Sequence, residues 1–166
     1  MTLSRVFCII LLAGMHNSLL ANWNGRWESK GADALIGLST DPQNPDLAKN
    51  AFLIIGYSKK FNCSPVVSVL VLNGQKVGTP VKQRTSKSKK NQLIVTADSK
   101  VFSDETKLTE YTNGMEMAMR GSQELVNALS NNNTPLSARV GSTVILDFSS
   151  ASGFEIANRR AKANCN

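Results

Sequence analysis

Short apolar runs rich in β-branched residues, separated by turn-forming residues, predict a chain built mainly from β-strands. The longest run covers residues 66–72, Val-Val-Ser-Val-Leu-Val-Leu, and a compact one covers residues 52–57. Residues 92–97 and 140–148 are expected to form two further strands. The number and spacing of these strands favour a single β-sandwich domain, with a small α+β fold as the alternative.

The dipeptide Asn73-Gly74 directly follows the longest run and predicts a tight hairpin. A type I′ turn needs positive φ at both central residues, which Asn and Gly adopt at little cost. Residues 75–82 are the expected partner strand, and Pro80 indicates that this strand lies at an edge or ends there. Residues 84–91 are polar and basic without periodicity, so we expect them to form a loop.

The segment Met-Glu-Met-Ala-Met-Arg, residues 115–120, alternates apolar and polar positions. An alternation with a period of two is typical of a half-buried strand. It puts Met115, Met117 and Met119 on one face, and we expect this face to pack on the core.

Two helices are predicted, one internal and one near the C-terminus. Ser122 can cap a short helix that runs to Leu129, and the polar stretch 131–135 ends it. Ser152 and Glu155 have the three-residue spacing of a capping box, which predicts a second helix at this point. The apolar face of the second helix consists of Phe154, Ala157 and Ala161.

The first 21 residues have the pattern of a secretory signal peptide. Arg5 precedes an apolar run from Val6 to Met15, and the small residue Ala21 comes before a polar residue. The run is too short to span a bilayer, which needs about 20 apolar residues. We expect cleavage after Ala21, which leaves residues 22–166 as one β-rich domain without a transmembrane segment, in the bacterial periplasm or secreted.

Removal of this leader changes which chemistry is available. The only histidine of the chain, His16, and one of its three cysteines, Cys8, lie in the leader. The remaining pair, Cys63 and Cys165, is expected to form a disulfide in an oxidising compartment. Free thiols or pairing between chains are the alternatives. Such a bridge would close a loop of about 100 residues and stabilise the fold by about 4–5 kcal/mol.

The positive charge is concentrated in the middle of the chain. The formal net charge is +7 for the whole chain and +6 once Arg5 is removed with the leader. A run of basic residues, such as the one between positions 76 and 90, attracts an acidic protein or another anionic envelope component. Nucleic acid is not expected outside the cytoplasm. A solvated loop without a ligand is the alternative. Between positions 76 and 90 no acidic residue occurs, and the basic ones are Lys76, Lys82, Arg84, Lys87, Lys89 and Lys90.

Without histidine, the chain from residue 22 onward cannot form a Ser-His-Asp or Cys-His catalytic set. The usual zinc sites need His or Cys ligands, so they are excluded as well when the two cysteines form a disulfide. A soft-metal site at the three methionines would likewise lack His and free Cys ligands. No phosphate-binding or dinucleotide-binding glycine motif occurs, and no cofactor is predicted. A carboxylate pair is the remaining route to an enzyme. The candidates are Glu28, Asp33, Asp104, Glu105, Glu110, Glu116 and Asp147. Asp147 lies in an apolar strand, where burial could raise its pKa, but a structural Asp with a partner is the more common outcome.

Trp23 and Trp27 lie four residues apart at the start of the expected domain. Exposed, they could stack on a sugar or bind a membrane surface. We expect instead that tryptophan at this place closes the core.

Several of these features occur together in a known layout. Trp27, a strand ending near Cys63, a basic middle and the spacing from Phe148 through Gly153-Phe154 to Cys165 make the chain similar to small exported proteins associated with type VI secretion clusters. It resembles the invasion-associated locus B family more distantly. Both resemblances imply a leader, a β-rich domain and a non-enzymatic accessory or binding role at the envelope.

The sequence therefore predicts an exported binding protein that serves a secretion or host-interaction system and recognises an acidic partner. An inhibitor or immunity protein against an envelope-acting toxin or hydrolase is the first alternative. A hydrolase or toxin that uses a carboxylate pair is the second.

Overall fold

The computed structural model describes residues 26–39, 43, 47–74, 76–86, 88–131 and 133–165. The predicted leader with its cleavage site lies outside these residues, and so does Trp23. Within the described ranges, none of the helices is long and apolar enough to cross a membrane.

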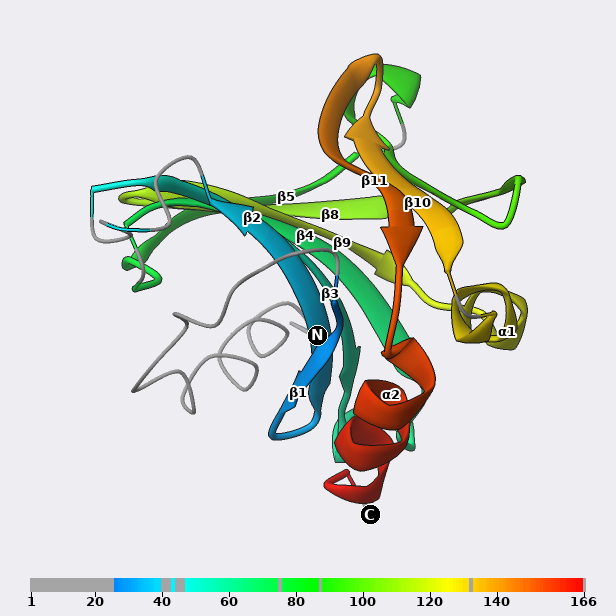
Figure 1. Ribbon diagram of the computed structural model, residues 1–166. Helices are drawn as coiled ribbons and strands as arrows, with labels where there is room; N and C mark the ends of the chain where they lie inside the picture. The colour runs from blue at the N-terminus through cyan, green and yellow to red at the C-terminus, as the bar shows by residue number, and fades with distance from the viewer. Residues whose placement is uncertain are drawn as a thin grey trace.

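Two antiparallel sheets form the fold, as the strand pattern predicts (Figure 1). The first sheet has seven strands, in the spatial order β1 (Glu28–Lys30), β2 (Asp33–Ser39), β3 (Lys49–Tyr57), β4 (Pro65–Asn73), β9 (Gly114–Arg120), β8 (Thr106–Tyr111) and β5 (Pro80–Ser86). The second sheet has four strands, in the order β11 (Thr143–Ala151), β10 (Thr134–Val140), β6 (Leu93–Ala97) and β7 (Lys100–Ser103). The architecture is mainly β and resembles a sandwich.

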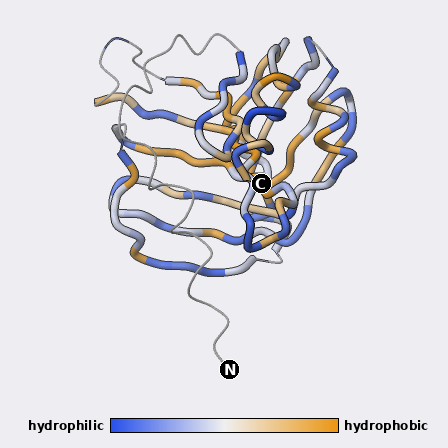
Figure 2. The backbone as a smooth tube through the Cα atoms, turned by 90° about the horizontal axis from the view of Figure 1, so that it is seen from below, coloured by the Kyte–Doolittle hydropathy of each residue, from blue (hydrophilic) through white to orange (hydrophobic). Residues whose placement is uncertain are grey.

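The larger sheet bends strongly, and the second sheet and both helices gather on one side of it (Figure 1). The helices are α1 (Gln123–Ser130) and α2 (Phe154–Ala163), and two short 3₁₀ turns are η1 (Lys59–Phe61) and η2 (Lys89–Asn91). Apolar stretches lie along the strands, while turns and exposed ends are hydrophilic (Figure 2). The main core therefore lies between the two sheets and the helices.

Alternate residues of the large sheet supply this core. Leu53 and Ile55 of β3, Val67 and Val69 of β4, and Met117 of β9 point to the same face and are buried. Met119 is buried with them, whereas Met115 at the start of β9 is exposed. The predicted methionine face is therefore confirmed for the two residues that the second sheet and the helices cover.

Both predicted helices exist, but only one is capped as expected. The Ser122 hydroxyl accepts a hydrogen bond from the Leu125 amide at 3.1 Å, which confirms the cap of α1. The predicted capping box at Ser152 is wrong, because the N-cap residue of α2 is Gly153. The Ser152 carbonyl instead accepts the Trp27 amide at 2.9 Å, so Ser152 remains part of a strand-like pairing and the helix starts one residue later.

The predicted Asn73-Gly74 hairpin is wrong. Strand β4 already has β3 on one side and β9 on the other, so the chain after Gly74 cannot pair with β4. It crosses to the far edge of the sheet and forms β5, which pairs with β8. The loop expected at 84–91 is wrong in part, since Arg84 to Ser86 belong to β5 and residues 89–91 form η2.

The late strand predicted at 140–148 is in fact the junction of two strands. Val140 ends β10, a two-residue turn follows, and β11 begins at Thr143. The runs at 52–57, 66–72, 92–97 and 115–120 are confirmed as β3, β4, β6 and β9.

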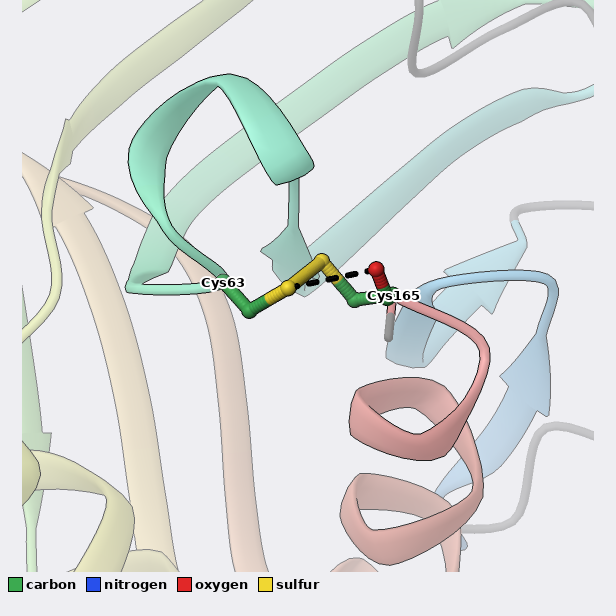
Figure 3. Close-up of a disulfide and its surroundings, with 2 residues drawn as sticks. All are labelled: Cys63 and Cys165. Atoms are coloured by element: carbon green, nitrogen blue, oxygen red, sulfur yellow. Dashed lines mark hydrogen bonds between the residues drawn. A yellow bond between two sulfur atoms is a disulfide. The ribbon is translucent and has the colours of Figure 1, made fainter.

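The predicted disulfide between Cys63 and Cys165 is confirmed, with Cα atoms 6.0 Å apart (Figure 3). Cys165 follows the end of α2, and Cys63 lies in the turn between η1 and β4. The Cys63 sulfur also lies 3.2 Å from the Cys165 carbonyl oxygen. The bond fastens the C-terminal helix to the end of β3 and β4.

The N-terminal end of the described chain is packed against the same helix. Trp27 is buried, and its ring meets the ring of Phe154 edge to face with centroids 4.7 Å apart. The expectation that Trp27 closes the core is confirmed.

Candidate functional site

Strand β5 forms one outer edge of the seven-stranded sheet. It pairs with β8 on one side, and no described strand pairs with its other side. Every residue of β5 except Ser86 is exposed. An open edge strand presents unpaired backbone N–H and C=O groups, which another extended chain can use.

Two of the predicted basic residues lie on this strand. Lys82 is directly opposite Glu110 of β8, and Arg84 is two residues further on, so both side chains are on the same face. A guanidinium nitrogen of Arg84 lies 3.3 Å from a carboxylate oxygen of Glu110. The pair is half exposed and contributes less than about 1 kcal/mol, so Glu110 orients Arg84 more than it stabilises the fold.

The rest of the predicted basic run lies on either side of β5. Lys76 is exposed in the segment that leads into the strand, and Lys90 is exposed in η2. Lys89 also belongs to η2, but its side chain is not among those described, and Lys87 lies outside the described residues. The structure thus brings Lys82 and Arg84 together on one strand and places Lys76 and Lys90 before and after it.

The backbone at Lys90 is held against the turn between β10 and β11. The Gly141 amide donates to the Gln92 carbonyl at 3.0 Å, and a Cβ added at Gly141 would lie only 2.4 Å from the Lys90 carbonyl oxygen. Gly141 also has a φ of 57°, which favours glycine. The segment from Lys82 to Lys90 is therefore held at both ends. Strand β8 pairs with its beginning in one sheet, and the turn between β10 and β11 lies against its end in the other.

The carboxylate candidates do not form one site. Glu28 and Asp147 are exposed, so Asp147 is not the buried carboxylate that its apolar strand allowed. The Asp147 side chain is on the outer face of β11, whereas its neighbours Leu146 and Phe148 are buried in the core. Asp104 and Glu105 lie together in an exposed turn, where an Asp104 oxygen accepts the Glu105 amide at 2.7 Å.

Asp33 and Glu116 are the two buried carboxylates among the candidates. They point to the face of the large sheet opposite the second sheet, and one oxygen of Asp33 has no hydrogen-bond partner. Burial, and then the nearby charge of Glu116, raises the pKa of Asp33 to about 7. No group of three or more residues of the kind that binds metal ions occurs among the described His, Cys, Asp and Glu side chains.

The raised pKa of Asp33 predicts that stability falls as the pH rises from about 4 to 7. In this window only the unfolded chain is ionised at Asp33, so unfolding releases a proton and becomes more favourable with pH. Each pH unit between the folded and unfolded pKa is worth about 1.4 kcal/mol, so the loss amounts to a few kcal/mol. Urea unfolding from pH 4.5 to 8 measures it.

The Asp33→Asn variant should lack most of this decline and be the more stable protein at pH 8. Asp147→Asn is the matched control, because its carboxylate is exposed, and it should keep the wild-type dependence. Parallel curves for wild type and Asp33→Asn would show that Asp33 is ionised in the folded protein.

The sequence contains only part of the signal for this acidic pair. The alternation at 115–120 already put Glu116 on the face opposite the methionines. That this opposite face is itself apolar and buried depends on which strands become neighbours, and the sequence pattern does not give that order.

No protein-family model, curated protein or solved structure matches this chain. The candidate site therefore rests on its own geometry, which is an open edge strand with a row of basic side chains.

Proposed function

We propose that this protein is an exported, non-enzymatic binding protein that holds an acidic, extended segment of another protein along β5. The single observation that carries the proposal is the open, exposed edge of β5 with Lys82 and Arg84 on it. Main-chain hydrogen bonds to the edge would supply affinity, and the basic side chains would select the partner.

The charge around the edge supports an acidic partner. From Gly74 to Ala97 the sequence has six basic residues and no acidic one. Charge complementarity of this kind raises the rate of association and excludes like-charged competitors. Glu110 is the acidic neighbour that β8 brings to this strand, and it is already engaged by Arg84.

The predicted export supports a role at the envelope. The leader pattern and the Cys63–Cys165 bond agree with an oxidising compartment. The resemblance in layout to small exported proteins of type VI secretion clusters favours an accessory of a secretion or host-interaction system. If the captured partner proves to be a toxin or hydrolase, the protein is an inhibitor or immunity protein acting through the same edge.

A capture experiment with matched charge variants tests the proposal. The first bait is the exported, oxidised protein, and the second has Lys82, Arg84, Lys87, Lys89 and Lys90 changed to Gln. The control bait loses five charges elsewhere, at Lys59, Lys60, Arg159, Arg160 and Lys162, all of which are exposed. An acidic envelope protein held by the first and control baits and lost by the second is the expected result.

Equal capture by all three baits would move the binding site away from the basic residues and contradict the proposal. Hydrogen exchange then tests the mode of binding. An acidic peptide from the partner should slow amide exchange in residues 80–86 if it adds as a strand. Unchanged exchange there, despite binding, would exclude strand addition.

A further inference from the structure

The edge strand β5 carries its two basic side chains in a regular order. By register, Lys82 and Arg84 point to the same face of the sheet as Leu108 of β8, which belongs to the main core. Gln83 lies between them and, like Thr85, points to the other face. The strand therefore presents a positive charge at every second position of this stretch, with uncharged side chains in between.

The stretch of β5 that presents these charges is short. A β-bulge between Pro80 and Lys82 interrupts the pairing with β8 at one end, and Val81 in this bulge is 68% exposed. At the other end Ser86, which shares the face of Arg84, is only 9% exposed. A partner strand therefore meets two basic places on this face, and a buried serine follows them.

An ion pair inside the sheet shows how Arg84 reaches a carboxylate on a neighbouring strand. Glu110 is opposite Lys82, so its contact with Arg84, at 3.3 Å between nitrogen and oxygen, runs diagonally from β8 to β5. The Arg84 side chain is 50% exposed, and a guanidinium has five N–H donors. It can therefore receive a second carboxylate from the open side of β5. Because like charges repel, Glu110 weakens the binding of that second carboxylate.

The start of this edge is held in place by a side chain of the neighbouring turn. Asn113, between β8 and β9, binds the segment that leads into β5. Its amide nitrogen donates to the carbonyls of Asn73 and Lys76 at 3.0 and 2.7 Å, and its oxygen accepts the Gly78 amide at 2.7 Å. A partner strand therefore meets a preformed edge, which reduces the entropy lost on binding.

Given that β5 binds an acidic segment as proposed above, we propose that the segment it selects has carboxylates at alternate positions, which face Lys82 and Arg84, and an uncharged residue between them. Opposite charges on neighbouring strands stabilise a sheet. Two adjacent acidic residues would instead put one carboxylate on the other face. There it would meet Gln83 and Thr85, while Lys107 of β8 lies one strand further in.

The probes are three end-blocked nine-residue peptides built from Thr, Val and Gln. The first has Glu-Val-Glu at its centre, the second has the same composition with Glu-Glu-Val there, and the third has Gln in place of both Glu. Amide chemical shifts in residues 80–86 of the isotope-labelled, exported and oxidised protein give each Kd during titration. The alternate peptide should have a Kd about fivefold lower than the adjacent one, and the neutral peptide should bind most weakly.

Charge variants test the role of each side chain. Lys82→Gln and Arg84→Gln should each give the alternate and adjacent peptides the same Kd, because one facing pair remains for either peptide. Lys59→Gln, which changes an exposed residue of η1, should keep the difference. Glu110→Gln removes the competing carboxylate and should lower the Kd of the alternate peptide about threefold.

The outcomes separate the alternate pattern from the proposed function. Equal Kd values for the two acidic peptides, both lower than that of the neutral peptide and both raised by Lys82→Gln, would leave the function of β5 in place and overturn the pattern. Tighter binding of the adjacent peptide would overturn the pattern as well. If no acidic peptide bound, or if shifts occurred only outside residues 80–86, the function proposed for β5 would fail together with the pattern.

Discussion

The double variant Cys63→Ala/Cys165→Ala is expected to lose about 4–5 kcal/mol of unfolding free energy. The bond joins residues 102 apart, so it removes much of the conformational freedom of the unfolded chain. In the folded protein it also holds the end of α2, whose face contacts β1, β2 and β3. Urea unfolding of the oxidised wild type and the variant, monitored by circular dichroism, measures the difference.

Reduction provides the matched control for this prediction. A reducing agent should bring the wild type to the midpoint of the double variant and leave the variant itself unchanged. A loss of this size approaches the whole stability of many domains, so the reduced protein should be partly unfolded at 37 °C. If reduced and oxidised wild type unfold at the same urea concentration, the bond has no such role.

Replacing Phe154 with alanine is expected to cost about 3–5 kcal/mol. Phe154 is the first residue of α2, is 2% exposed, and packs edge to face on Trp27. Its loss leaves a cavity where the N-terminal end of the described chain, α2 and the large sheet meet. The measurement is the shift in urea midpoint at a constant slope.

Ile156 on the same helix is the matched control, because its side chain is 51% exposed. Ile156→Ala removes a similar apolar group and should change the unfolding free energy by less than about 0.5 kcal/mol. If both variants lost the same amount, the cost would lie in the helix itself and the contact between Phe154 and Trp27 would not matter.

The turns show where local sequence is a poor guide to this fold. Gly74 does have the positive φ of 84° that the Asn-Gly signal predicts. However, the Gly74 amide donates to the Ala48 carbonyl, just before β3, and the Asn73 amide donates to the Asn113 carbonyl, in the turn between β8 and β9, so both amides are bound by other segments of the chain. A tight two-residue hairpin occurs instead at Asp98 and Ser99, where both residues have positive φ. Local chemistry permits a turn, but strand order decides which turn becomes a hairpin.

Strands with a continuous apolar pattern were predictable, and polar edge strands were not. Strands β3 and β4 lie in the middle of the large sheet and are apolar on both faces, which leaves a strong signal. Among the described strands, β5 (residues 80–86) pairs with β8 alone and is mostly exposed, so its sequence remains polar and lacks the alternation that marks a strand. The polar pattern of residues 84–86 therefore predicts a loop, although these residues belong to an exposed strand.

The candidate site follows the same division. The basic residues Lys82 and Arg84 could be identified from charge alone, because a cluster of charges can be counted in the sequence without knowledge of the fold. Their position on an open edge required the strand order. The acidic pair Asp33 and Glu116 is contributed by β2 and β9, strands separated by β3 and β4, and the charge of Glu116 nevertheless acts on Asp33.

The open edge of β5 has a consequence for the protein in concentrated solution. An unpaired edge strand can pair with the same strand of a second copy and begin aggregation. Two copies meeting at β5 would bring Lys82 and Arg84 of each close to those of the other, and like charges on adjacent strands repel. The positive charges that would attract an acidic partner thus also keep the protein from associating with itself, and solubility should decline as they are removed.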